Sequence, residues 1–305
     1  MSFLARTQAL IISHAEVLGS YLKTNNTDQL LPRIGKIKVV GDALQMASVN
    51  TLATAGFITS GGTPDASATT FDASPRNFPL RRCATKVEVA GDVAQNVSMI
   101  NDVFEQQIQA KMIAMWNAVG DKLINGSGSD PEPSSLLTLG AEHPDGVGSL
   151  GTAITLAALD DMIRRVRPWD GGTTRAFVMN RGQYMKVVQA AHAAGLDLPI
   201  MNDAVLGKPL LHYCGVPMLI SDWITDTEAG TKTSIYLVIL GPRDGEPQYG
   251  GLVWFYNGDT GPGIKVDGPH RNSGTTDILF ATLDLNIGFA SMSTGSVYHL
   301  QNITP

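Results

Sequence analysis

The pattern closest to a chemical motif in this sequence is Gly146-Val-Gly148-Ser-Leu-Gly151, which has the glycine spacing of a dinucleotide-binding loop. Such a loop works only where a strand ends immediately before the first glycine, because the backbone then meets the pyrophosphate at a helix N-terminus. Here the polar run Glu142-His-Pro-Asp145 precedes the glycines. The sequence therefore favours a flexible loop, and a nucleotide-binding α/β enzyme is a remote alternative.

The histidines are scattered along the chain. None belongs to an HExxH helix or pairs with a cysteine at zinc spacing, and no GxSxG elbow anchors a catalytic triad. The six are His14, His143, His192, His212, His270 and His299. We expect them to be surface or half-buried side chains, and we predict no catalytic residue, no metal site and no cofactor.

Two groups of acidic residues have simpler interpretations than catalysis. The pair Asp160-Asp161 is expected early in a helix, where negative charge complements the helix dipole. Asp259, Asp267 and Asp277 surround a stretch rich in Gly and Pro without the spacing of an EF-hand. Turns are therefore favoured over a calcium site.

Composition points to assembly. Charged residues make up 16% of the 305 residues, against about 25% in a typical soluble domain. Fewer charges imply that less of the surface is exposed to solvent than in a soluble monomer. A net charge of −6 argues against a generally basic nucleic-acid surface, although residues 1–40 carry five Lys or Arg against two Asp or Glu. We interpret this excess as a solvated basic arm.

The cellular setting is predicted from what the sequence lacks. Cys83 and Cys214 lie far apart and outside any CxxC motif, so two reduced, half-buried thiols are expected. Neither a signal pattern nor an apolar run of about 20 residues is present. We expect a protein made in the cytoplasm with no membrane contact.

The element that organises the rest is a long amphipathic helix at residues 101–126. Apolar residues recur at steps of three or four and form one stripe. They are Val103, Phe104, Ile108, Met112, Met115, Trp116, Val119 and Leu123. Asp102 and Glu105 fit a capping box, and Asn125-Gly126 predicts a left-handed stop.

Upstream of this helix, the pattern predicts an arm and a long β-hairpin. Residues 3–22 read as an amphipathic helix followed by a polar linker. Residues 36–50 and 80–93 alternate as strands and are expected to pair with each other, with a bulge after Val40-Gly41. The tip, residues 51–79, is poor in core-forming side chains, and a lone two-stranded ribbon is marginally stable in water. We expect the hairpin to lie on a neighbouring subunit.

Downstream, helices and strands alternate. A helix capped by Thr155 is followed by a buried strand, 175–180, and by a helix that Asn180 caps and Gly195 ends. Two short strands surround Gly215. Further strands are expected at 234–240, 251–257, 264–267, 277–290 and 295–303.

This order of parts resembles the major capsid proteins of tailed bacteriophages, which have the Hong Kong 97-like fold, over nearly the whole chain. The most telling stretch runs through Ala176-Phe-Val-Met-Asn180, Gly207-Lys-Pro-Leu210, Gly215-Val-Pro217 and Ser221-Asp222. The resemblance implies an α+β fold with an N-terminal arm (1–35), an extended β-hairpin loop (36–93), a peripheral domain and an axial α/β domain (151–263). The peripheral domain would combine 94–150, including the spine helix, with 264–305.

The resemblance implies a structural role and no enzymatic activity. The chain would self-assemble as pentamers and hexamers into an icosahedral shell of a virion, put together in the host cytoplasm. The shell would enclose double-stranded DNA and contact it non-specifically. A separate scaffolding protein, a portal and a decoration protein are further partners that the family allows. An encapsulin, a compartment of the same fold that packages an enzyme, is the alternative.

Two family features are not expected here. Some members begin with a scaffolding segment of about a hundred residues, for which there is no room before the hairpin. Others crosslink through a hairpin lysine, but Lys36, Lys38 and Lys86 lie near the base of this hairpin and none lies in its tip.

Six large apolar residues are the candidate inter-subunit contacts. Four lie in the hairpin: Phe57, Ile58, Phe71 and Phe78. Trp169 and Trp223 lie beside turns, where ordinary packing and an interface anchor are equally good interpretations. Deleting residues 51–79 should leave the subunit able to fold but stop shells from forming.

Overall fold

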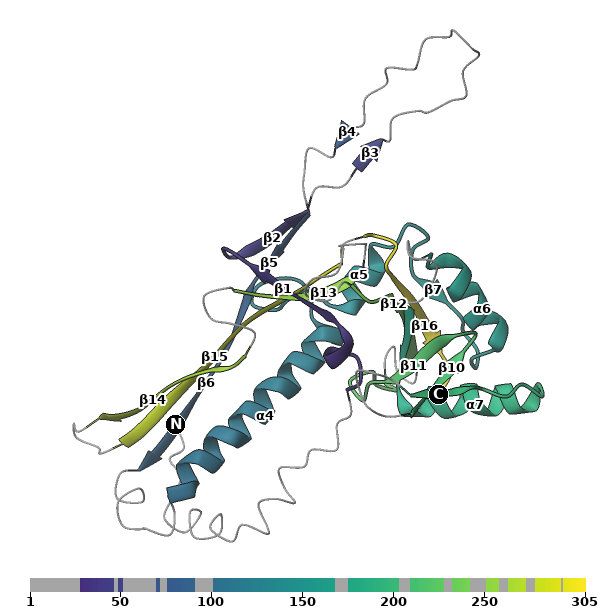
Figure 1. Cartoon of the computed structure of the whole chain (residues 1–305). Coiled ribbons are helices and arrows are strands. Elements are labelled where there is room, and N and C mark those ends of the chain that lie inside the picture. Colours follow the sequence, from purple (N-terminus) through teal and green to yellow (C-terminus); the bar gives the residue numbers. More distant parts are fainter. Residues whose placement is uncertain are drawn as a thin grey trace.

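The chain is built around a long helix and two β-sheets (Figure 1). In this computed structural model the described residues are 28–46, 49–51, 70–71, 76–90, 101–167, 175–202, 209–227, 232–241, 251–257, 263–272, 278–291 and 293–305. The predicted arm helix, residues 3–22, lies outside them.

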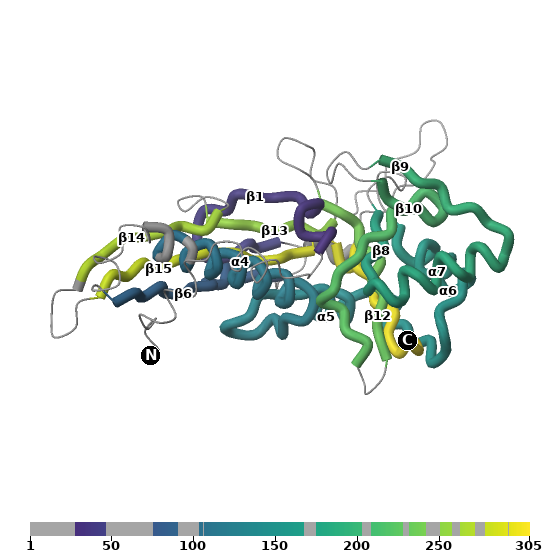
Figure 2. Tube along the Cα trace, turned by 90° about the horizontal axis from the view of Figure 1, so that it is seen from below, coloured from purple at the N-terminus to yellow at the C-terminus, as the bar shows by residue number. Residues whose placement is uncertain are grey.

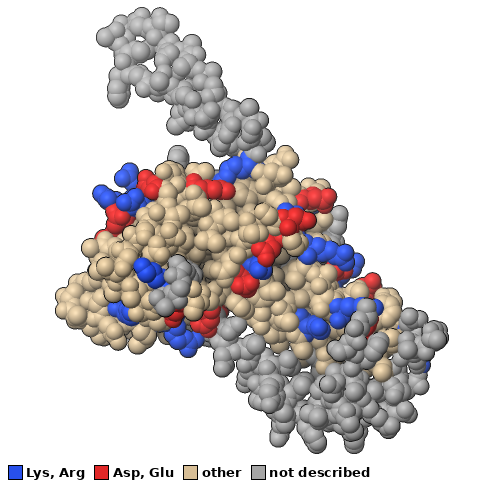
Figure 3. Space-filling view, turned by 180° about the vertical axis from the view of Figure 1, so that it is seen from behind, with Lys and Arg blue, Asp and Glu red and all other residues tan. Residues whose placement is uncertain are grey.

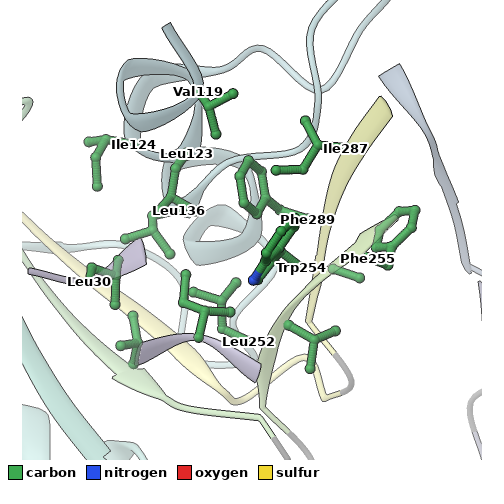
Figure 4. Packing of buried hydrophobic residues seen from close by; sticks show 14 of the residues in the cluster. Leu30, Val119, Leu123, Ile124, Leu136, Leu252, Trp254, Phe255, Ile287 and Phe289 are labelled. Carbon is green, nitrogen blue, oxygen red and sulfur yellow. The ribbon is translucent and has the colours of Figure 1, made fainter. Parts of the chain in front are cut away.

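The spine helix is α4, Asn101–Asn125, as the apolar stripe predicted. Its second half buries Met115, Val119 and Leu123, while Trp116 meets Trp254 edge to face with ring centroids 6.5 Å apart. Figure 4 shows the C-terminal end of this stripe packed against strand residues of the neighbouring sheet.

The predicted left-handed stop at Gly126 is wrong. Its N–H donates to the carbonyl of Lys122 at 3.1 Å, which continues the helical turn, and the left-handed residue is Gly128 with φ 73°. A Cβ at Gly126 would lie 2.6 Å from the Lys122 carbonyl, so close packing and not backbone conformation accounts for this glycine.

A five-stranded sheet lies along α4 (Figure 2). Its members are β1 (Gly35–Val39), β6 (Arg81–Ala90), β13 (Leu252–Asn257), β14 (Lys265–Asn272) and β15 (Ile278–Ser291). β15 is the centre: it pairs antiparallel with β6, β13 and β14, while β1 is parallel to β13. β15 is 14 residues long, which lets it hold β13 at one end and β14 at the other.

The predicted pairing at the base of the hairpin is wrong. Residues 36–50 and 80–93 do not form one ribbon, because β1 pairs with β13 and β6 pairs with β15. The ribbon itself consists of β2 (Ala43–Met46) with β5 (Arg76–Pro79), then β3 (Val49–Thr51) with β4 (Thr70–Phe71). Gly41, with φ 108°, separates β1 from β2 where a bulge was expected.

A seven-stranded sheet forms the second half of the molecule. Its order is β7-β16-β12-β8-β11-β10-β9. The bounds are β7 (Gly148–Ser149), β8 (Arg175–Met179), β9 (Ile200–Asn202), β10 (Pro209–Tyr213), β11 (Val216–Ile220), β12 (Thr233–Ile239) and β16 (Val297–Ile303). All seven residues of β12 are buried, with Tyr236 and Val238 in the core near α4 and Ile235 and Leu237 in a second core. A strand that is covered on both faces explains the unbroken apolar run.

Short helices with capped starts complete this half. They are α5 (Leu136–Ala141), α6 (Leu156–Arg165) and α7 (Arg181–Ala193). Thr155 and Asn180 cap α6 and α7 as predicted. The stretch that begins at Leu136 forms α5 because Ser135 and Thr138 make a capping box. The single turn Leu31–Arg33 is a 3₁₀ helix.

Three strands lie on the other side of a predicted domain boundary. β13, placed in the axial domain, belongs to the sheet of the spine helix, while β7 and β16, placed in the peripheral domain, belong to the seven-stranded sheet. Both differences involve partners distant in sequence, which local patterns do not reveal. Leu30 and Ile34, within the predicted arm, are buried in the body. As a whole the domain division stays a prediction.

Gly288 of β15 packs closely against Phe255, the residue with which it pairs in β13. A Cβ at Gly288 would lie 2.3 Å from Cζ of Phe255. We therefore expect Gly288→Ala to lower the free energy of unfolding by about 1–3 kcal/mol, measured by urea denaturation. Gly263→Ala, at an exposed position with nothing within 4 Å, is the matched control and should change it by less than about 0.5 kcal/mol. Equal losses in both variants would contradict this account.

Candidate functional site

The projecting hairpin is the first candidate surface for binding another protein chain. Its root is firmly held: Phe78 is 4% exposed within the core, and the Arg76 guanidinium stacks on the Phe78 ring at 4.9 Å. Arg76 also donates to the Ser291 carbonyl at 3.1 Å and pairs with Glu142. Burial lowers the pKa of Arg76 from its usual value. Beyond this root, β2 to β5 run away from the body (Figure 1).

The six predicted contact residues fare differently. The prediction for Phe78 needs correction, because a side chain that is 4% exposed has almost no surface to offer another subunit. Trp223 is half-buried and packs against α4: a Cβ at Gly120 would lie 2.5 Å from its Nε1, and its carbonyl accepts from Asn125 at 3.1 Å. As an interface anchor it stays a prediction. Phe57, Ile58 and Trp169 lie outside the described residues, and of Phe71 only the backbone, in β4, is described.

An apolar edge strand is a second candidate surface, and sequence reasoning missed it. In β9, Ile200 is 68% and Met201 54% exposed. Among the strands that the structure describes, β9 has a neighbour on one side only, β10. A free strand edge with apolar side chains is a surface suited to pairing with another chain. The sequence feature that could have revealed it is the apolar pair Ile200-Met201, which lies outside every predicted helix and strand.

The chain enters the body beside the seven-stranded sheet. Asp28 forms a β-bridge with Ser221, and its carboxylate accepts from the N–H of Leu30 at 3.0 Å. The Gln29 side chain accepts from the N–H of Ile220 at 3.0 Å, and Leu30 is fully buried. Burial raises the pKa of Asp28 to about 6, and the nearby charge of Asp222 adds to the rise. These contacts anchor residues 28–30 beside the seven-stranded sheet.

Three histidines are more buried than predicted. His143, His212 and His299 are 5%, 9% and 2% exposed. His299 shares a 2.9 Å hydrogen bond with the Ser234 hydroxyl and stacks on Tyr236 at 4.6 Å. Desolvation lowers the pKa of His299 to about 4, so it is neutral at physiological pH. His299 is a packing residue where α5 meets β16, since a Cβ at Gly140 would lie 2.8 Å from its Cβ.

The acidic pair has roles other than the one predicted. Asp160 and Asp161 lie in the middle of α6, not in its first turn. Asp160 accepts from the Tyr213 hydroxyl at 2.8 Å, and burial together with this hydrogen bond raises the pKa of Tyr213. Asp161 bonds Arg164 and Arg165, each at 2.6 Å. Of the suspected calcium ligands, Asp267 pairs with His270 at 3.2 Å, and Asp259 and Asp277 lie outside the described residues.

The glycine pattern is part of a sheet. Gly148 and Ser149 form the edge strand β7 beside β16, and no strand immediately precedes Gly146. A Cβ at Gly148 would lie 2.5 Å from the Tyr298 hydroxyl, while Gly146 and Gly151 have φ of 70° and 74°. Turn geometry and close packing therefore explain the three glycines.

The described residues contain no group of three or more His, Cys, Asp or Glu arranged for a metal ion. No helix among them is long and apolar enough to span a membrane. Both cysteines are free thiols; Cys83 is half-buried and Cys214 is exposed, where half-burial had been predicted for both.

Comparison with solved structures gives consistent matches. The holo-SrpI encapsulin complex from Synechococcus elongatus PCC 7942 matches with a TM-score of 0.70 at 18% identity, covering 90% of this chain and 87% of that chain. The capsid of a native GTA particle matches with a TM-score of 0.62 at 15% identity, covering 90% of both chains. The cyanophage A-1(L) capsid matches with a TM-score of 0.63 at 14% identity, covering 92% and 94%.

These matches rest on structure alone, since no family model and no curated protein sequence matches the chain. They extend over nine-tenths or more of its length, so the likeness concerns the whole architecture. The α+β fold predicted from the order of elements is confirmed.

Proposed function

We propose that this chain, which has the Hong Kong 97-like fold, is a structural shell protein that self-assembles as pentamers and hexamers into an icosahedral capsid enclosing double-stranded DNA. The observation that carries the proposal is the whole-chain likeness to shell proteins at TM-scores of 0.62 and 0.63 with two capsids. This role does not require a separate scaffolding protein, a portal or a decoration protein, but it allows each of them as a further partner.

The hairpin and the edge of β9 would let each subunit contact several neighbours through separate surfaces. A two-stranded ribbon that leaves the body has no second layer of its own, so a neighbouring subunit supplies one. The edge of β9 offers backbone donors and acceptors at the far end of the other sheet. Each contact need only be modest in energy, because closure of a shell makes every subunit hold several neighbours at once.

An encapsulin-type compartment is the second candidate, and a specific observation favours it: a TM-score of 0.70 with an encapsulin complex. The two functions differ in content. The proposed capsid encloses DNA, which nuclease-treated particles would retain. A compartment would instead retain a co-purified protein, so nucleic-acid content and mass spectrometry of purified particles separate the two.

Self-assembly is tested by sedimentation and negative-stain microscopy of the protein expressed alone. We expect closed particles, or rings of five and six subunits. A chain that stays monomeric at the highest soluble concentration would contradict self-association without a scaffold, and nucleotide-dependent rises in melting temperature would then favour the remote enzyme alternative.

The edge strand β9 gives a sharper test. We expect Met201→Asp to suppress rings and shells while leaving the subunit folded, because a charge at this apolar edge opposes pairing with another chain. Leu137→Asp is the matched control: Leu137 is 43% exposed on α5, away from β9, and its variant should assemble normally. Circular dichroism establishes folding, and sedimentation measures assembly. Normal shells from Met201→Asp would exclude β9 from the interface.

A further inference from the structure

A pocket of about 520 Å³ lies where α6 ends, near the loop that leads into β16. Its walls carry three guanidinium groups and one imidazole, and no role described above uses it. The residues that matter for its chemistry are His143, Asp145, Arg164, Arg165, Arg167 and Gly295.

His143 supplies an unsatisfied donor to this pocket. Its Nδ1 accepts from the N–H of Asp145 at 3.1 Å, so Nε2 carries the proton in the neutral ring. The ring lies edge to face on Tyr298 at 5.0 Å, which holds its orientation. His143 is 5% exposed, and its Nε2 has no hydrogen-bond partner among the described residues. A buried polar group without a partner is costly, so a missing acceptor is implied.

Gly295 leaves room in front of this donor. A Cβ at Gly295 would lie 4.0 Å from His143 Nε2, with no other atom that close. The absence of a side chain at Gly295 therefore keeps the imidazole N–H next to open space in the pocket, where an acceptor could approach.

The arginines divide into fixed and available cations. Arg165 is held by Asp161 at 2.6 Å, by Asp145 at 3.6 Å and over the Tyr298 ring at 5.5 Å. Arg167 uses its Nε for the carbonyl of Arg164 at 3.3 Å, and no ion pair is found for it within the described residues. Its two terminal nitrogens remain donors for an anion, and guanidinium groups bind phosphate oxygens with paired hydrogen bonds.

We propose that this pocket binds a phosphate group, with Arg167 and His143 Nε2–H as its principal donors and Arg164 beside them. Three arginines face two carboxylates, Asp145 and Asp161, so the site keeps a net positive charge. On the face shown in Figure 3, basic and acidic side chains are interspersed over the coloured residues. Phosphate binding would be confined to this pocket, and it does not depend on the shell function.

Two sources can provide the same chemistry: free inorganic phosphate, or a backbone phosphate of a single nucleic-acid strand. Isothermal titration of the full-length protein with inorganic phosphate, at constant ionic strength set by chloride, tests the site itself. Competition by a short single-stranded oligonucleotide then distinguishes the sources, because displacement of phosphate assigns the pocket to nucleic acid and lack of displacement assigns it to the free ion.

Matched variants locate the binding. We expect saturable phosphate binding that weakens at least tenfold in Arg167→Gln, which removes donors, and in Gly295→Leu, which fills the space before His143. Arg181→Gln is the control, since Arg181 is exposed on α7 and does not line this pocket, and it should bind as the unaltered protein does.

Three results would overturn the proposal. One is the absence of saturable phosphate binding. Another is an equal loss of affinity in the Arg181→Gln control, which would indicate general charge screening. The third is unchanged affinity in both pocket variants while circular dichroism shows them folded. In the first case, binding of an acidic peptide in place of phosphate would assign the pocket to carboxylates.

Discussion

Replacing residues 47–75 by Asn-Gly should abolish shell formation without unfolding the subunit. Met46 and Arg76 are the last paired residues of β2 and β5, so a two-residue turn can close the ribbon between them. The replacement removes β3, β4 and everything between them but keeps the root of the hairpin. We expect subunits or small oligomers in place of particles, because the ribbon's contacts with neighbours are lost at every position in the shell.

The site of replacement matters because Phe78 is a core residue. Deleting residues 51–79, as the sequence alone suggested, would remove Phe78 and all of β5 and would confound assembly with folding. A shorter replacement of residues 52–69, between the paired Thr51 and Thr70, keeps β3 and β4 and tests the tip alone. Sedimentation and microscopy measure assembly, and circular dichroism measures folding. Normal particles from the 47–75 replacement would refute the hairpin's role.

The parts predicted well were those with a local physical cause. The 101–126 stripe gave α4 because burial of one face at helical spacing needs no knowledge of the partner. Thr155 and Asn180 marked helix starts because a capping side chain bonds the N–H groups of its own first turn. The order of these elements was enough to reach the fold.

The parts predicted badly depend on partners distant in sequence. Nothing in Gly35–Val39 indicates that it pairs with Leu252–Asn257 and not with the facing hairpin strand. Phe78, a large aromatic residue in a projecting hairpin, was expected to anchor a contact between subunits. The Arg76 side chain and the adjoining sheet bury it instead. The phosphate pocket was not foreseen for the same reason, since His143 and Arg167 line one pocket only after α5 and α6 have each packed on β16.

Asp28→Asn should stabilise the subunit at neutral pH. Burial raises the pKa of Asp28 from 3.8 to about 6, so the folded state disfavours the carboxylate. Below pH 3.8 the group is protonated in both states and has no effect. As the pH rises toward 6 the unfolded state loses its proton first, and stability falls by about 2–3 kcal/mol. Asparagine carries no charge and keeps an oxygen for the N–H of Leu30.

The expected result is a gain of about 2 kcal/mol at pH 7.5 that shrinks below about 0.5 kcal/mol at pH 4, measured by urea denaturation of both proteins at equal concentration. The comparison uses the difference in stability between the two proteins, because His299 changes stability with pH in the opposite direction. The pKa of His299 is lowered from 6.5 to about 4, so its contribution to stability is lost as the pH falls through that range. In the unaltered protein this loss masks the gain from protonating Asp28. Asp42→Asn, at an exposed position, is the control and should change the free energy of unfolding by less than about 0.5 kcal/mol. A gain that persists unchanged at pH 4 would mean that the amide stabilises by new contacts and that charge burial at Asp28 is not the cause.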